Sequence, residues 1–136
     1  MRDDMTPLFQ PIKIGNMDLR NRIVMAPMAT AYARSSAVSQ QLLDYYVERA
    51  KGGIGLIITE PACIDVPLGL GVYMPNMDLP ILSIDTDDSV GKLQQLPTEV
   101  HKHGAKIALQ LMHAGRYARM KLAGLQPVAP TAIASK

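Results

Sequence analysis

KIALQLMHAGR, residues 106–116, places polar residues at the end of a short apolar segment. The part Lys106–Leu111 predicts a strand that is buried on both faces, because a continuous apolar run leaves no polar face for solvent. Gln110 lies inside this strand, and His113 and Arg116 follow it. In parallel α/β folds, ligands bind at the C-terminal ends of the strands. The stretch therefore predicts a strand end that holds a ligand.

Two earlier segments follow the same plan. Ile23–Ala26 is an apolar run that stops at Pro27, and Ile54–Thr59 is an apolar run that stops at Glu60-Pro61. Both runs predict buried strands with a ligand-facing end. Glu60 is a candidate acid or base, but at this position a carboxylate more often caps or pairs with a neighbouring loop. We therefore expect a loop contact for Glu60.

Helical spacing occupies the gaps between these strands. Gln40–Lys51 carries one apolar face and begins after Ser39, a residue type that caps helices. The segment from Ser89 to His103 has a second apolar face, and we expect a kink or break at Pro97 inside it. The segment from Asp65 to Thr86 is rich in Gly and Pro and predicts a long irregular loop.

The order of these segments decides the fold class. Leu8–Leu19, with Gly15-Asn16 at its turn, predicts an N-terminal hairpin. Three parallel strands and two helices follow, with short helix-to-strand connections and long loops after the strands, which is typical of a (β/α)8 TIM barrel. A complete barrel takes ~200–250 residues, so we expect residues 1–136 to be the N-terminal segment of a single barrel domain. A small three-strand α/β domain is the alternative.

Composition excludes several classes of function. Lys and Arg number 14 against 12 Asp and Glu, and the net charge of +2 gives no basic patch for nucleic acid. The single cysteine, Cys63, cannot form an internal disulfide, and we expect no metal site. The N-terminus lacks the apolar core of a signal peptide, and no run is long enough to span a membrane. We therefore expect a cytoplasmic protein.

Three segments together resemble the old yellow enzyme family of FMN-dependent ene-reductases. They are Leu8–Met28, which includes LRNRIVMAPM, Tyr46–Glu60, which ends in GLIITE, and His101–Arg116 with the later PVAPTAI at 127–133. The form MAPMAT at 25–30 is most similar to the branch of NADH:flavin oxidoreductases and 2,4-dienoyl-CoA reductases. The resemblance covers nearly the whole chain, and QLxHAGR is its most specific part.

The resemblance implies a function and a set of site residues. The expected enzyme transfers a hydride from NADH or NADPH through the N5 atom of FMN to a small-molecule activated alkene. By position, the residues that would line the cofactor are Ala26, Pro27, Met28, Ala29, Pro61 and Gln110. Thr30, His113 and Arg116 would lie near the substrate or support the loops, and a carboxylate tie is the favoured role for Arg116. No residue of the chain is assigned as catalytic.

Departures from the family pattern leave alternatives open. Ala29 stands where many members have Thr or Cys against the flavin, and Thr30 is the residue that could partly substitute. The family's substrate-activating and phosphate-binding residues, and the Cys-rich segment that holds a 4Fe-4S cluster in one branch, belong to later strands. One alternative is therefore a non-catalytic truncated or split α/β module that acts through assembly with another chain, by homo-oligomerisation or self-association. Another is a barrel oxidoreductase that acts on amines.

Overall fold

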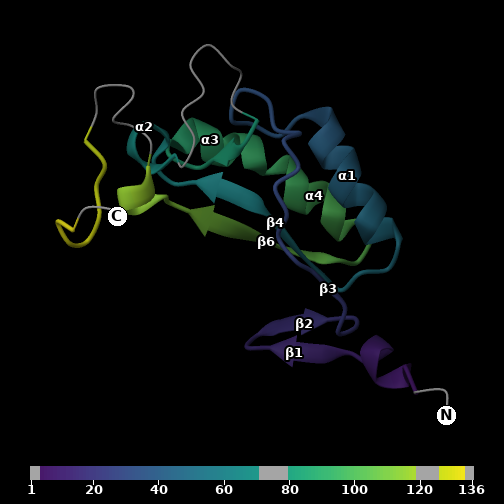
Figure 1. Cartoon of the computed structure of the whole chain (residues 1–136). Coiled ribbons are helices and arrows are strands. Elements are labelled where there is room, and N and C mark those ends of the chain that lie inside the picture. The colour runs from purple at the N-terminus through teal and green to yellow at the C-terminus, as the bar shows by residue number, and fades with distance from the viewer. Residues whose placement is uncertain (1–3, 71–79, 119–125, 134–136) are drawn as a thin grey trace.

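The computed structural model describes residues 4–70, 80–118 and 126–133. It begins with a 3-10 turn, η1 (Thr6–Phe9), and an antiparallel hairpin of β1 (Ile12–Ile14) and β2 (Met17–Leu19). Gly15 lies at the hairpin turn with φ of 56°, a left-handed conformation that glycine adopts without strain. The predicted hairpin is confirmed, and it lies at the end of the molecule opposite the tips of the β4 and β6 arrows (Figure 1).

A parallel sheet forms the centre of the molecule. Its strands are β3 (Val24–Met25), β4 (Leu56–Cys63), β5 (Leu82–Ser83) and β6 (Lys106–Met112), and all pair with β4 in parallel. Because β6 follows one edge of β4 over its whole length, β3 and β5 share the opposite edge. The three predicted parallel strands are therefore confirmed, with a fourth added. Their predicted burial is wrong for β3 and β6, since Val24 is 45% exposed and Leu111 is 61% exposed.

The predicted loop between Asp65 and Thr86 is more ordered than expected. It contains the short helix α2 (Val66–Gly69) and the strand β5, while its residues 71–79 lie outside the described part of the chain. A two-residue strand and a one-turn helix are too short to produce a hydrophobic period, which is why the sequence does not predict them.

The first helix, α1 (Gln40–Lys51), has the predicted bounds, and the Ser39 side chain accepts a hydrogen bond from Leu42 N. The second predicted helix is two helices, α3 (Asp87–Leu93) and α4 (Gln95–His101). The break falls at Gln94 instead of Pro97. Pro97 lies in the first turn of α4, where the backbone N–H groups have no partner within the helix, so its missing N–H breaks no hydrogen bond there.

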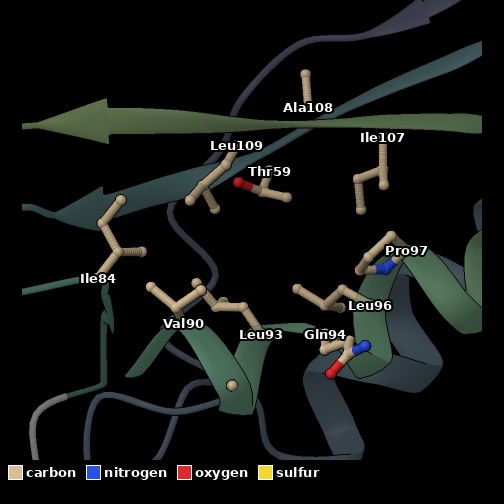
Figure 2. Close-up of a pocket in the computed structure, with 11 residues that line it drawn as sticks. Thr59, Ile84, Val90, Leu93, Gln94, Leu96, Pro97, Ile107, Ala108 and Leu109 are labelled. Atoms are coloured by element: carbon tan, nitrogen blue, oxygen red, sulfur yellow. The ribbon is translucent and has the colours of Figure 1, made fainter. Parts of the chain in front are cut away.

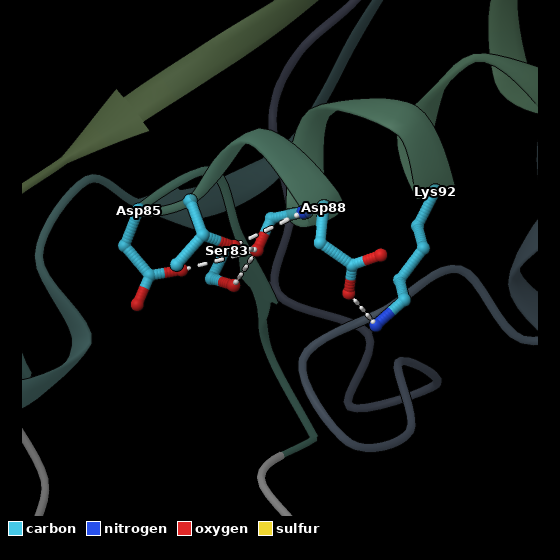
Figure 3. A network of polar contacts seen from close by, with 6 residues as sticks. Ser83, Asp85, Asp88 and Lys92 are labelled. Carbon is cyan, nitrogen blue, oxygen red and sulfur yellow. Dashed lines mark hydrogen bonds and ion pairs between the residues drawn. The ribbon is translucent and has the colours of Figure 1, made fainter.

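Thr86 and its neighbours fix the start of α3. The Thr86 hydroxyl accepts from Ser89 N, and the Ser89 hydroxyl donates to Asp85 at 3.1 Å. One turn further on, Asp88 pairs with Lys92 (Figure 3). The cap supplies a partner for one N–H group that the first helical turn leaves free.

Helices α1, α3 and α4 all lie on one side of the sheet (Figure 1). The core between them includes Leu42, Ile57, Leu96 and Val100, each at most 2% exposed. Ile107 and Leu109 of β6 point toward the helices, while Ala108 between them points away and is exposed (Figure 2). A sheet covered by helices on one face and bare on the other is the arrangement of a barrel wall. In the described residues, no helix is both long and apolar enough to cross a membrane.

Candidate functional site

The ends of β4 and β6 bring together two of the predicted cofactor-lining residues. Pro61 and Gln110 are direct partners in the β4–β6 register. The register shifts between Ile58 and Pro61, so that β4 has one residue more than β6 there, which is a β-bulge. The predicted end of this strand at Glu60-Pro61 was wrong, because β4 continues through the bulge to Cys63.

Glu60 joins the end of β4 to the loop that follows β3. Its Oε2 atom accepts a hydrogen bond from Thr30 N at 2.9 Å and a second one from the Thr30 hydroxyl. The Glu60 side chain is 2% exposed, and its Oε1 atom has no hydrogen-bond partner among the described residues. The predicted loop contact of Glu60 is confirmed.

Thr30 uses its hydroxyl inside this contact. The hydroxyl donates to Glu60 and accepts from Tyr32 N at 3.2 Å. Its single proton is therefore committed to Glu60. The expectation that Thr30 could partly substitute for the side chain missing at Ala29 stays a prediction.

Tyr46 holds the bulge from the helix side. Tyr46 belongs to α1. Its hydroxyl accepts a hydrogen bond from Glu60 N at 2.7 Å, and its side chain is fully buried. Burial is the main cause that raises the pKa of Tyr46 to about 12. The hydrogen bond from Glu60 N opposes this rise in pKa, and the charge interaction with Glu60 adds to it. The sequence indicated only core packing for Tyr46, since a helical stripe does not reveal which hydroxyl has a partner.

This raised pKa predicts a loss of stability in strong base. A phenol whose pKa is near 10 when unfolded and about 12 when folded keeps its proton better in the folded state. Its contribution is complete below pH 10 and is lost as the pH rises from 10 to 12, by up to about 2 kcal/mol. Urea denaturation at pH 8 and at successive values up to pH 12 should show a steeper loss for wild type than for Tyr46→Phe. Equal slopes would contradict the assignment.

Gln110 has an uncommitted side chain. Its backbone N–H donates to Thr59 Oγ1 at 3.3 Å, while its amide makes no hydrogen bond to the described residues. Gln110 is two residues beyond Ala108, so the alternation of a strand puts it on the same bare face of the sheet. A free amide on that face offers one acceptor and two donors to a ligand.

The loop after β3, on the other edge of β4 from Gln110, presents an apolar strip to solvent. Ala26, Met28 and Ala29 are exposed, with Met28 at 52%, and Pro27 is half-buried. The bond between Thr30 and Glu60 fixes the end of this strip to β4. An exposed apolar strip and a donor–acceptor amide that belong to the strand ends of one sheet fit a flat heteroaromatic ring with a polar edge, such as that of a flavin.

His113 and Arg116 lie past the end of β6 and have structural contacts. His113 Nδ1 accepts from Gly115 N at 2.9 Å, and the His113 ring packs so closely on Gly69 that a Cβ there would come within 2.8 Å of it. Arg116 is exposed and contacts Tyr117, with a hydrogen bond to its hydroxyl at 3.2 Å. The carboxylate tie expected for Arg116 is absent from the described residues.

A groove lies away from His113 and Arg116. It has a volume of about 440 Å³ and opens between α3, α4 and the helix-facing side of β4 and β6, where Leu93, Leu96 and Leu109 line it (Figure 2). Its lining is apolar apart from Thr59 and Gln94. The described ranges contain no cluster of His, Cys, Asp and Glu that could hold a metal ion.

Comparison with known proteins identifies the family of the chain. The sequence profile of the NADH:flavin oxidoreductase / NADH oxidase family matches residues 7–135. The chain belongs to this family. Among its relatives in the family, an NADH oxidase of Thermoanaerobacter brockii is 46% identical over 128 residues, which are 93% of this chain and 19% of that protein. An N,N-dimethylglycine/sarcosine dehydrogenase of Chromohalobacter salexigens is 38% identical over 82% of this chain and 16% of its own length.

Solved structures of old yellow enzymes have the same fold. The Old Yellow Enzyme from Pichia sp. AKU4542 superposes with a TM-score of 0.77 and 35% sequence identity. The superposition covers 93% of the present chain and 32% of the Pichia enzyme's chain. The chain thus spans between about a sixth and a third of the length of these three proteins. This agreement confirms the old yellow enzyme resemblance and the N-terminal part of a TIM barrel as the fold.

Proposed function

We propose that this chain supplies part of the flavin site of an FMN-dependent, NAD(P)H-linked ene-reductase. The observation that carries the proposal is the pairing of Pro61 with Gln110, whose side-chain amide makes no hydrogen bond to the described residues. Membership of the NADH:flavin oxidoreductase family supports flavin as the ligand. The activity belongs to the whole protein, of which this chain carries one wall of the site.

The residues of the chain have separate tasks in this proposal. Ala26, Pro27, Met28 and Ala29 would pack against the face of the isoalloxazine ring and exclude water from it. Gln110 would bind the polar edge of the ring through its amide, because that edge presents both N–H and C=O groups. The chemistry that bound FMN supplies is the transfer of a hydride from NADH or NADPH to an activated alkene.

A change of Gln110 to Leu tests this assignment. The substitution keeps the size of the side chain but removes its donors and acceptor, and we expect it to weaken FMN binding about tenfold, the effect of roughly 1.4 kcal/mol of lost hydrogen bonding. FMN affinity of the full-length protein is measured by the quenching of flavin fluorescence. Gln40→Leu, at the exposed start of α1, is the matched control and should bind FMN like wild type.

Two results would contradict the proposal. Absence of bound flavin in the wild-type protein would exclude the function, and equal FMN affinity of Gln110→Leu and Gln40→Leu would exclude Gln110 as a ligand of the ring. Reduction of a simple enone such as cyclohexenone, followed with NADH and with NADPH, then tests the reaction.

A second candidate function is the oxidation of amines. The relative from Chromohalobacter salexigens, a dehydrogenase of N,N-dimethylglycine and sarcosine by name, is 38% identical over 116 residues. Both functions use the same flavin wall, so the Gln110 variant does not separate them. Reduction of the bound flavin by sarcosine without added nicotinamide would favour the amine over the alkene.

A further inference from the structure

The bulge of β4 at Thr59 and Glu60 connects the two parts of the proposed flavin wall, the strip Ala26–Ala29 and Gln110. Thr59 Oγ1 accepts from the backbone N–H of Gln110 at 3.3 Å, and Glu60 Oε2 accepts from the backbone N–H of Thr30 at 2.9 Å. Thr30 directly follows the strip Ala26–Ala29. Two neighbouring residues of β4 therefore bind both the end of the strip, at Thr30, and the backbone of Gln110.

The bulge is itself fixed on its third side. The Tyr46 hydroxyl accepts from Glu60 N at 2.7 Å, so that α1 holds the backbone at the residue where the register shifts. Bulges of this kind re-aim side chains next to active sites. Here the extra residue lets both Thr59 and Glu60 act as acceptors, one toward β6 and one toward the loop after β3.

Burial of the Glu60 side chain lowers stability in a way that a merely structural contact does not require. Its carboxylate is 2% exposed, and its Oε1 atom lacks a hydrogen-bond partner in the described part of the chain. A buried polar atom without a partner lowers stability, and such atoms concentrate at functional sites where geometry matters more than stability.

We propose that Glu60 is a positioning residue, which sets the distance of the strip Ala26–Ala29 from the flavin through its two bonds to Thr30. This inference rests on the proposed function, since it needs a flavin at the strand ends. Glu60 does not touch the reacting atoms in this proposal. Glu60 acts through Thr30. Because the neighbouring Thr59 binds the Gln110 backbone at the same bulge, the positions of Glu60 and Gln110 are linked.

The test uses the full-length, flavin-loaded protein and three variants. Glu60→Leu removes both acceptors, Glu60→Gln keeps one side-chain oxygen for Thr30, and Thr30→Val removes the hydroxyl but keeps the N–H. The matched controls are Glu48→Leu and Thr98→Val, which change the same residue types on the exposed faces of α1 and α4. The readouts are the FMN dissociation constant, the flavin absorption maxima and the separate values of kcat and KM.

We expect Glu60→Leu to weaken FMN binding at least tenfold and to shift the flavin absorption maxima, because the strip that covers the ring is released. Thr30→Val should shift the maxima in the same direction with a threefold to fivefold loss of affinity, and Glu60→Gln should recover most of the wild-type values. Combining Glu60→Leu with Thr30→Val should add little, since the two changes break the same contact.

Several outcomes would overturn the inference. If Thr30→Val and Glu60→Leu both keep the absorption maxima and FMN affinity of the wild-type protein, the contact does not set the flavin geometry. The proposed function would still stand in that case, provided that the wild-type protein binds flavin. If Glu60→Leu fails to fold, Thr30→Val decides: a lowered melting temperature with unchanged flavin spectrum and affinity would reduce Glu60 to a structural role. Absence of flavin from wild type would instead exclude the proposed function itself.

Discussion

Replacing Gly55 by Ala is expected to lower the free energy of unfolding by about 3 kcal/mol, the upper range for overpacking a tight site. A Cβ at this position would lie 2.5 Å from Asn21 Oδ1 and 2.7 Å from the Asn21 carbonyl oxygen. Asn21 cannot move aside easily, because its side chain donates to Gly53 O and accepts from Ile23 N. The backbone of Gly55 is also held, since its N–H donates to Ile23 O and its carbonyl accepts from Lys106 N.

Gly91→Ala is the matched control for this prediction. Gly91 lies within α3, and a Cβ there meets nothing within 4 Å. Alanine has the higher helix propensity, so this variant should gain about 0.5–1 kcal/mol. Urea denaturation followed by circular dichroism measures both variants. A similar small change in the two would show that Gly55 has room for a side chain.

Replacing Arg20 by Lys is expected to cost about 2 kcal/mol, from the loss of several hydrogen bonds to a charged donor, discounted for solvent exposure. The Arg20 guanidinium donates to Ile54 O at 2.8 Å, to Ala50 O at 2.9 Å and to His103 O at 2.7 Å. It thereby joins the end of α1, the approach to β4 and the turn after α4. A lysine ammonium lacks the planar fork that reaches three carbonyls at once.

Arg22→Lys, two residues further on, is the control for this change. Arg22 is also exposed, and its side chain makes no hydrogen bond to the described residues. Its substitution should change the unfolding free energy by less than about 0.5 kcal/mol, the usual range for a surface site. Equal midpoints of urea denaturation for the two variants would contradict the clamp role of Arg20.

Long elements with a clear period were predictable from the sequence. The helix at Gln40–Lys51 has its apolar face, its Ser39 cap and a glycine after it, so local signals and packing agree there. The apolar runs at 56–59 and 106–111 likewise lie in the sheet. Elements without a period were not predictable: β5 has two residues, and its place beside β4 depends on pairing with Ala62 and Cys63.

The break between α3 and α4 shows the same limit. The sequence shows that the helix is disturbed near Pro97, because proline has no N–H group. It does not show at which residue the helical hydrogen bonding is interrupted. In the folded chain Leu96 and Val100 are buried against the sheet and α1. That packing is satisfied when α4 begins at Gln95, ahead of the proline.

The sequence by itself determined the family and the order of the long strands and helices, because apolar periods and the stretch at 106–116 are local properties of the chain. Only the tertiary structure decided where the strands end and how their ends are held together. The contact of Thr30 with Glu60 joins residues 30 positions apart, and that of Thr59 with Gln110 joins residues 51 positions apart. Both depend on a one-residue register shift in β4, and a register is set by pairing between strands, which no local pattern records.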